Sequence, residues 1–375
     1  MTRTVADEHI TGIQPYVPGK QVAEIQREYG IDDVVKMASN ENPLGPSPKA
    51  LEVIREHTVN VHIYPDGAVH DLKHAVADFH DRPVEEVIFG NGYDQLLRLA
   101  VQTMARHGED HGVVSQHSFG AYPIALRAHD MDYDAVEMAD GLRYDLGAMR
   151  RAVCGDTRVV FIANPNNPTG TYVDGEVLRS FLRDLPDDVL AIVDEAYHQY
   201  VQADDYETAL KMREEHELLM VTRTFSKCYG LAGLRLGYAI APSEAIEAMD
   251  RVRAPFNVNR LAQKAGIAAL EDTEFLDRSV ELNERGRSQM ITGLQELEGR
   301  GIDWVPSETN FLLVEVPFDG REVYERMLHH GVIVRPMHGY GLPQHLRITI
   351  DTEQNNERCL AALGSAISEL ESGRT

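Results

Sequence analysis

The sequence predicts an α/β fold in which a mostly parallel central sheet, covered by helices, is joined to a smaller α+β domain. A chain of 375 residues is long enough for a large core and two domains. Short apolar runs alternate with helical patterns, which is typical of parallel strands buried on both faces. The pattern changes beyond about residue 302, which indicates a second unit. We expect a large domain at 46–255 and a small domain, with an N-terminal arm, made of 1–45 plus 256–375.

The elements of the first two thirds follow from local patterns. One amphipathic helix is expected at 22–29 within a lead-in at 7–36, and another helix at 48–57. The loop between them, 37–48, is dense in Pro, Asn and Gly, so it either packs as a connector or lines a site. A further helix, beginning near 94, has an apolar face. Apolar runs predict buried strands at 87–89, 112–114, 158–163, 189–193 and 218–221.

The C-terminal third is expected to form the smaller domain. Its predicted helices are a long one at 272–297, one at 321–330 and a final one that holds Leu360, Leu363, Ile367 and Leu370. Its predicted strands are 310–316, 332–334 and 346–350.

The composition excludes several classes of partner. The formal net charge is −24, from 60 acidic and 36 basic side chains, which argues against nucleic acid and anionic membranes. Acid excess with few lysines fits life in high salt, and an ordinary acidic cytosolic protein is the alternative. We see no membrane-spanning run and no signal peptide. Three scattered cysteines, Cys154, Cys228 and Cys359, indicate reduced thiols and a cytoplasmic location.

Lys227 stands in the most informative stretch of the chain. It follows a predicted buried strand, with Thr224 and Ser226 before it and Arg235 after it. A lysine in a dry pocket can lose its proton near neutral pH and attack a carbonyl group. The hydroxyls and the arginine could hold a phosphate, so the stretch suggests pyridoxal phosphate. A surface lysine on a loop is the alternative.

Polar residues also follow three other predicted strands, and ligands of open α/β sheets bind beyond the carboxyl ends of strands. Gly92 and Tyr93 open a helix whose N-terminus offers N–H groups to a phosphate. Asn167 lies in a rigid turn, and Asp194 and Tyr197 follow the next strand. A carboxylate there could pair with a protonated pyridine nitrogen. Taken one at a time, Asn167 could be a turn residue, Asp194 a helix cap and Tyr197 a core aromatic. Their occurrence together, in this order, favours one cofactor site.

Longer motifs extend this argument to a family. Asn-Pro-Asn-Asn-Pro-Thr-Gly at 164–170, Asp-Glu-Ala-Tyr at 194–197 and Ser-Lys-x-x-x-x-Ala-Gly-Leu-Arg-x-Gly-Tyr at 226–238 resemble the fold-type I, class I/II pyridoxal-phosphate aminotransferases. The chain is most similar to the histidinol-phosphate aminotransferase subfamily, and the resemblance covers nearly its whole length. That similarity rests on Pro-Tyr-x-Pro-Gly at 15–19, Ser-Asn-Glu-Asn-Pro-Leu-Gly-Pro-Ser-Pro at 39–48, Tyr-Pro-Asp at 64–66 and Val-Arg-Pro-Met-x-Gly-Tyr-Gly-Leu-Pro at 334–343.

The resemblance implies a role for each matching residue. Lys227 would carry pyridoxal phosphate as a Schiff base and, once freed, act as the base; Asp194 and Tyr197 complete the implied catalytic set. Asp194 would pair with the pyridine nitrogen of the cofactor ring, and Asn167 and Tyr197 would bond its O3′. Phe119 would stack on the ring. The phosphate would be held by Gly92, Tyr93, Thr224, Ser226, Arg235 and, in a homodimer, the partner subunit's Tyr64. The substrate would meet Tyr16, Asn42, Tyr64, Asn167 and Arg335, with Arg347 on the α-carboxylate.

The chain departs from the family pattern at four positions. Phe119 replaces a tyrosine common in relatives, and Tyr93 replaces a small residue. His198 stands where an apolar residue is common and His338 where glycine is common. These positions bear on ring stacking, the phosphate cup and the choice of substrate.

The resemblance implies transamination of histidinol phosphate with 2-oxoglutarate or glutamate, in histidine biosynthesis. The alternatives are an aromatic-amino-acid aminotransferase or a phosphothreonine decarboxylase of the same subfamily. A non-catalytic binding protein on this fold would have no need for Lys227. His70 and His74 are spaced for zinc, but the glutamate of the catalytic zinc motif is missing, so no metal is expected.

Overall fold

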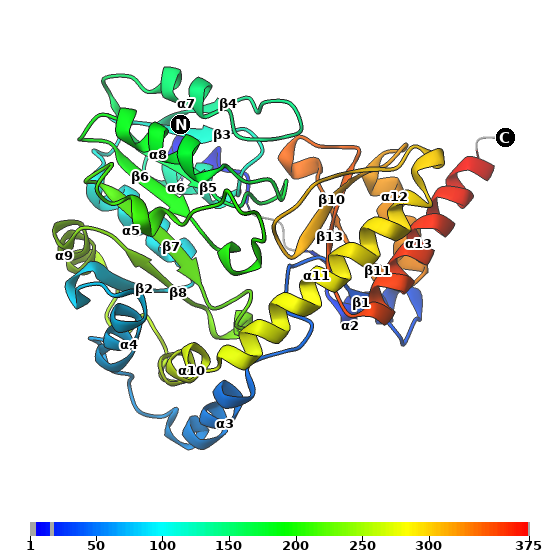
Figure 1. The fold of residues 1–375 in the computed structure, drawn as a ribbon, viewed down its shortest axis with the longest axis horizontal. Coiled ribbons are helices and arrows are strands. Elements are labelled where there is room, and N and C mark those ends of the chain that lie inside the picture. The colour runs from blue at the N-terminus through cyan, green and yellow to red at the C-terminus, as the bar shows by residue number, and fades with distance from the viewer. Residues whose placement is uncertain (1–4, 16–18, 374–375) are drawn as a thin grey trace.

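The computed structural model describes residues 5–15 and 19–373, which form a large sheet with its helices and a smaller sheet region beside it (Figure 1). Within those ranges, none of the helices combines the length and the apolar character needed to cross a membrane.

In the described chain, a seven-stranded sheet forms the centre of the large region, in the order β2-β8-β7-β6-β5-β3-β4. Its strands pair in parallel except β8, which is antiparallel to both neighbours, so the predicted mostly parallel sheet is confirmed. The strands are β2 Val87–Asn91, β3 His111–Ser115, β4 Asp132–Val136, β5 Thr157–Ala163, β6 Leu190–Asp194, β7 Leu219–Thr224 and β8 Leu236–Ile240.

Helices cover both faces of this sheet, because successive side chains of a strand point to opposite faces. In β5, Val160 and Ile162 belong to the core shared with α4, α7, α8 and α10, whereas Val159 and Phe161 pack in the core with α5, α6 and α9. The helices of this region are α3 Pro48–His57, α4 His70–His80, α5 Tyr93–Met104, α6 Ala121–Ala128, α7 Leu146–Ala152, α8 Gly175–Asp184, α9 Ser243–Val252 and α10 Arg260–Leu270.

The smaller region is built on an antiparallel sheet in the order β12-β13-β10-β9, with β1 and β11 paired in parallel beside it. The long helix α11 runs next to α13 along this region, and its other end approaches α10 (Figure 1). The strands are β1 Val35–Lys36, β9 Asp303–Val305, β10 Phe311–Glu315, β11 Val332–Ile333, β12 Arg335–Pro336 and β13 His345–Thr349. The helices are α2 Val22–Tyr29, α11 Thr273–Gln295, α12 Gly320–His329 and α13 Glu353–Ser372. The short helix α1 Glu8–Thr11 packs instead against α6 of the large region.

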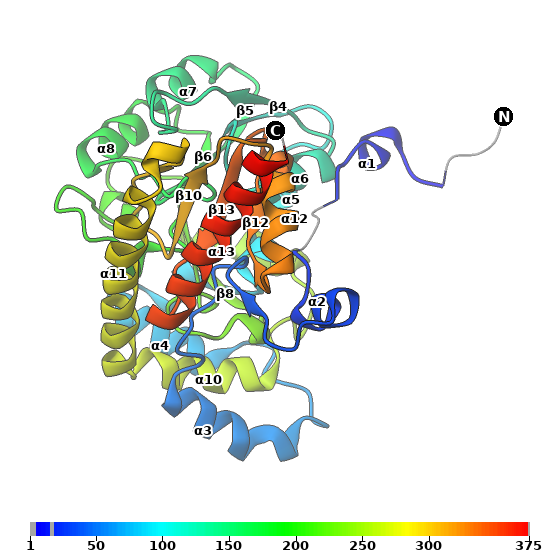
Figure 2. The same ribbon diagram turned by 90° about the vertical axis from the view of Figure 1, so that its right-hand side faces the viewer.

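Most predicted elements are confirmed, and one expected strand ends a residue early. The strand predicted at 332–334 is found as β11, which ends at Ile333, and the chain then enters β12 of the other sheet at Arg335, a strand that the sequence did not predict. In the view of Figure 2, α13 lies in front of the small sheet while α1 stands to one side, beyond α6.

The strand register explains where a site can form. Ala163 lies opposite Asp194, and Asp194 lies opposite Thr222, so the carboxyl ends of β5, β6 and β7 reach the same edge of the sheet. In the small sheet, Arg335 of β12 lies directly opposite Arg347 of β13. Residues directly opposite on antiparallel strands project on the same face, so the two arginines share one face of this sheet.

Candidate active site

A pocket of about 360 Å³ lies at that sheet edge, between the large and small regions. Its lining brings together most of the residues predicted from the sequence. They are Tyr93, Phe119, Asn167, Tyr197, Ser226, Lys227, Arg235 and Arg347, joined by Ser39, Asn40, Asp94, Arg98, Ala121 and Ile124.

Lys227 is a buried amine in this pocket. Its Nζ donates to the Ser39 carbonyl oxygen at 3.1 Å and lies 5.6 Å from the centre of the Tyr197 ring. Burial, helped by the positive charge of Arg347, lowers the pKa of Lys227 to about 7. A large part of this amine is therefore neutral near pH 7 and can act as a nucleophile or a base.

Asp194 lies beneath the pocket at the end of β6, with only 3% of its surface exposed. Its carboxylate accepts hydrogen bonds from Tyr122 Oη at 2.7 Å and from the Ala196 N–H at 3.0 Å. Burial raises the pKa of Asp194 to about 6, against the opposing effect of the Tyr122 hydrogen bond. Such a carboxylate is suited to pair with a cationic ring nitrogen, because a positive partner favours its charged form.

Arg347 and Tyr197 are each held by partners from a distant part of the chain. Arg347 donates to Asn167 Oδ1 at 2.5 Å and to the Ala38 carbonyl oxygen at 2.9 Å, and it is 5% exposed. Its Nε is buried without a hydrogen-bond partner among the described residues. Tyr197 Oη accepts from Asn40 Nδ2 at 2.9 Å. A desolvated guanidinium with a spare donor, fixed in this way, can bind a carboxylate.

The other end of the pocket forms a cradle suited to an anion. Arg235 donates to Ser226 Oγ at 3.5 Å and to Asp94 Oδ1 at 3.0 Å. Gly92, with a φ of +79°, precedes α5, and a Cβ there would collide with the Arg235 guanidinium and the Asp94 carboxylate. The positive φ favours glycine at this turn, whereas the two side-chain ends could move aside, and the free N–H groups of α5 begin beside it.

Some predicted residues lie away from the pocket lining. Thr224 is buried behind it, where its Oγ1 accepts from the Ser226 N–H at 3.0 Å. Asn42 donates to the Cys228 carbonyl oxygen at 2.8 Å and to Ser279 Oγ at 2.9 Å, so it packs the loop against the body. Tyr64 lines a separate surface cavity. Tyr16 lies outside the described residues.

Arg335 opens onto a neighbouring cavity of about 770 Å³, which shares Ile124 with the Lys227 pocket. The two arginines on one face of the small sheet are therefore distributed between two adjoining spaces, with Arg347 in the first and Arg335 in the second. An elongated ligand with an anion at each end would suit this arrangement.

The four departures fall in different places. Phe119 and Tyr93 both line the pocket, with ring centroids 6.0 Å apart. His338 is outside it and contacts Asp319 Oδ2 through Nε2 at 3.0 Å, which holds the turn at 338–340 against the start of α12. His198 begins the short helical turn after Tyr197 and does not line the pocket either.

Five polar contributors were not predicted from the sequence: Tyr122, Ser39, Asn40, Asp94 and Arg98. Tyr122 looks like an ordinary apolar-face residue of α6, and its hydroxyl gave no local signal. The pattern of the loop at 37–48 allows a connector or part of a site, and the structure shows both roles. Ser39 and Asn40 line the pocket, while Asn42 packs the loop against the body. The donor set fits pyridoxal phosphate: an amine with a lowered pKa, a buried carboxylate and an anion cradle.

Comparisons with known proteins agree with this chemistry. The model of the family "Aminotransferase class I and II" matches residues 32–363. A histidinol-phosphate aminotransferase of Anaeromyxobacter sp. is 45% identical over 95% of this chain and 97% of its own length. Histidinol-phosphate aminotransferase 2 of Pseudomonas aeruginosa is 44% identical over 97% of this chain and 98% of its own. Among solved structures, histidinol-phosphate aminotransferase from Sinorhizobium meliloti in complex with pyridoxal-5'-phosphate has a TM-score of 0.87 at 28% identity, covering 99% of both chains.

Proposed function

The chain belongs to the class I and II aminotransferases, and from this premise we propose that it transfers an amino group between histidinol phosphate and 2-oxoglutarate, forming glutamate, in histidine biosynthesis. One observation carries the proposal: Lys227, with its pKa lowered to about 7, faces the same pocket as the buried Arg347. The adjoining cavity with Arg335 supports the phosphorylated substrate, because arginine's fork suits a phosphate.

Pyridoxal phosphate is the cofactor, and when bound it supplies an electron sink for the electrons released at the substrate's α-carbon. Lys227 attaches it covalently through the neutral amine. Once a substrate amine takes the place of Lys227 on the cofactor, the freed Nζ would act as the base that takes and returns the proton of the substrate's α-carbon. Asp194, as the anion, keeps the ring nitrogen protonated, and Asn167 and Tyr197 hold O3′.

The remaining contacts orient the two substrates. Arg347 clamps the α-carboxylate of glutamate in one half-reaction and tolerates the hydroxymethyl group of histidinol phosphate in the other. Arg335 would shape the distal end, whereas Asn42 supports the site only indirectly, by packing the loop at 37–48 against the body. Tyr16, the third residue expected there, lies outside the described residues. Tyr93, Ser226 and Arg235 would form the phosphate cup, and Phe119 would stack on the ring. Thr224 and Gly92 would support the cup from behind, because Thr224 Oγ1 accepts from the Ser226 N–H and the Gly92 N–H donates to the Arg235 carbonyl oxygen.

The proposal also covers the domains, the subunits and the location of the enzyme. We propose residues 46–255 as the cofactor-binding domain and 1–45 with 256–375 as the small domain and arm, with one correction at the boundary: α10 packs in the core of the large region and belongs to the cofactor-binding domain. The enzyme works as a homodimer in which the partner subunit's Tyr64 completes each site, supported by a Tyr64 side chain that is 77% exposed in its own chain. We place it in the cytoplasm, where its three free cysteines stay reduced.

The test combines attachment and substrate choice. Borohydride added to the holoenzyme should fix the cofactor to the peptide that contains Lys227, and labelling of another lysine would overturn the assignment. In a separate sample that has not been reduced, the cofactor spectrum should change on adding histidinol phosphate or glutamate, and change back on adding 2-oxoglutarate. A spectrum that responds only to phenylalanine favours an aromatic aminotransferase, and release of CO₂ from phosphothreonine favours a decarboxylase.

A further inference from the structure

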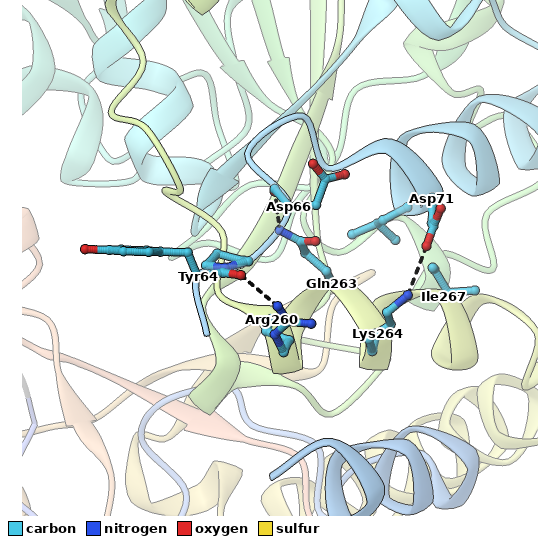
Figure 3. Close-up of a pocket in the computed structure, with 9 residues that line it drawn as sticks. Tyr64, Asp66, Asp71, Arg260, Gln263, Lys264 and Ile267 are labelled. Atoms are coloured by element: carbon cyan, nitrogen blue, oxygen red, sulfur yellow. Dashed lines mark hydrogen bonds and ion pairs between the residues drawn. The ribbon is translucent and has the colours of Figure 1, made fainter. Parts of the chain in front are cut away.

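The segment Tyr64–Asp66 is gripped through its backbone by two side chains of α10 (Figure 3). Arg260 Nη2 donates to the Tyr64 carbonyl oxygen at 2.7 Å, and Gln263 Nε2 donates to the Asp66 carbonyl oxygen at 2.8 Å. Gln263 is 7% exposed and also donates to the Val258 carbonyl oxygen at 3.0 Å. The contacts reach carbonyl groups on both sides of Pro65, so they fix the path of the backbone and leave the Tyr64 ring available.

A third anchor holds the same segment from its other side. The Asp66 carboxylate accepts the N–H groups of Ala68 at 3.0 Å and His70 at 2.7 Å, at the start of α4. These backbone hydrogen bonds lower the pKa of Asp66. The segment is therefore bound to two helices at once. An exposed loop could hydrogen-bond to water instead, so these contacts indicate that its position matters.

The Tyr64 ring points outward, away from the helix that holds its backbone. It is 77% exposed and stacks on Phe256 with ring centroids 4.8 Å apart, and Figure 3 shows it pointing away from α10 and from the cavity there. Val59, Val61 and Ile63, just before it, are also exposed, at 73%, 66% and 49%. Neighbouring exposed apolar side chains of this kind mark a contact surface for another protein.

We propose that Arg260 and Gln263 are positioning residues that set Tyr64 for the cofactor pocket of a second copy of this chain. This inference rests on the proposed function, in particular on the sharing of Tyr64 between subunits. The two residues act through Tyr64 on the partner's pocket, and within their own chain they line only the cavity beside Tyr64.

The variants are Arg260→Met and Gln263→Leu, which keep most of each side chain's bulk. Lys264→Met is the matched control: Lys264 lies on the same helix and lines the same cavity, but its Nζ contacts Asp71 Oδ2 at 2.9 Å and not the loop. We expect both variants to weaken pyridoxal phosphate binding, measured by titrating apoenzyme fluorescence, by up to about tenfold, because each loses one hydrogen bond to a carbonyl of the loop, from the buried Gln263 or the half-buried Arg260. The control should stay within about twofold, because exposed ion pairs contribute little. The dimer, followed by sedimentation, should persist.

Hybrid dimers separate action on the partner from action within one chain. Mixing Lys227→Ala chains with Arg260→Met chains gives hybrids in which one pocket has an intact Lys227 and receives Tyr64 from a chain with an intact Arg260. That pocket should regain wild-type cofactor affinity and KM. In a random equal mixture, about a quarter of all pockets are of this kind, and they should stand out at cofactor concentrations too low to fill the Arg260→Met homodimers. Lys227→Ala mixed with Tyr64→Ala is the reference for sharing itself.

The outcomes are distinguishable. Recovery with Tyr64→Ala but not with Arg260→Met overturns the positioning role and leaves the sharing of Tyr64 intact. Failure of both mixtures, with hybrids demonstrated, removes sharing and this inference with it. If both variants dissociate into monomers, the residues hold the interface and not Tyr64, which also overturns the proposal. Should histidinol phosphate fail as a substrate, the cofactor titrations still decide the role of Arg260.

Discussion

The lowered pKa of Lys227 predicts how the rate of cofactor attachment depends on pH. An ordinary lysine has a pKa near 10.5, and burial together with the Arg347 charge lowers that of Lys227 to about 7. At pH 7 the neutral amine is then roughly a thousandfold more abundant than it would be on an unperturbed lysine. Since only the neutral amine attacks the aldehyde, the rate of cofactor attachment should rise through about pH 7 and level off above it.

Arg347→Leu tests the electrostatic part of this account. Arg347 is the largest charge that lowers the pKa of Lys227, so its removal should raise that pKa and move the midpoint of attachment to higher pH, by about one unit or 1.4 kcal/mol. The midpoint should stay below that of an exposed lysine, because burial, the larger cause, remains. Arg347→Lys is the matched control, because it keeps the charge and removes the planar fork.

The assay uses apoenzyme mixed with pyridoxal phosphate across a pH series, stopped with borohydride, with the labelled Lys227 peptide measured by mass. A midpoint that stays in place or moves to lower pH in Arg347→Leu would refute the electrostatic argument. A midpoint that shifts equally in Arg347→Lys would show that packing around Asn167 and Ala38, which Arg347 contacts, controls the lysine.

Three further outcomes are expected. Asp194→Asn should still bind the cofactor but lose more than tenfold in kcat, about 1.4 kcal/mol, since the ring nitrogen is no longer held protonated; a smaller loss counts against this role. Arg335→Leu should lose thirty- to thousandfold in kcat/KM with histidinol phosphate, roughly 2–4 kcal/mol, and far less with phenylalanine, whereas equal losses make Arg335 structural. If the net charge of −24 reflects a high-salt habitat, Tm and activity should rise toward molar KCl, because salt screens self-repulsion, and indifference to KCl would remove that idea.

The sheet was predictable where its strands are buried on both faces. β5, β6 and β7 are continuous apolar runs, because helices cover each side of them. β4, at the edge of the sheet, is polar and largely exposed and gave no such run. β8 could not be predicted as an apolar run, because Gly237 interrupts it. That glycine is needed there, since a Cβ would collide with the backbone of Tyr93 at the start of α5.

The site was predictable to the extent that its residues follow strands in the chain. Asn167, Asp194 and Lys227 each come within a few residues of a strand end, and neighbouring strands bring those ends together. Tyr122 and Asn40 could not be found in this way, because each reaches the site from an element whose own pattern indicates only a helix face or a loop. Their function depends on a tertiary contact, to Asp194 and to Tyr197 respectively.

Residues 38–40 show how the two regions are kept in register around the lysine. Three consecutive residues each hold a different functional side chain: the Ala38 carbonyl accepts from Arg347, the Ser39 carbonyl accepts from Lys227, and Asn40 Nδ2 donates to Tyr197. The same loop is fastened to the small sheet, since the Asn40 N–H donates to Thr349 Oγ1 at 3.0 Å and Asn310 Nδ2 donates to the Asn40 carbonyl oxygen at 3.1 Å. These groups are buried, so breaking one contact leaves an unsatisfied partner, which costs more than the bond itself contributes. A shift of the small sheet would therefore disturb Arg347 and Lys227 together, and this common loop keeps the two side chains in a fixed relation.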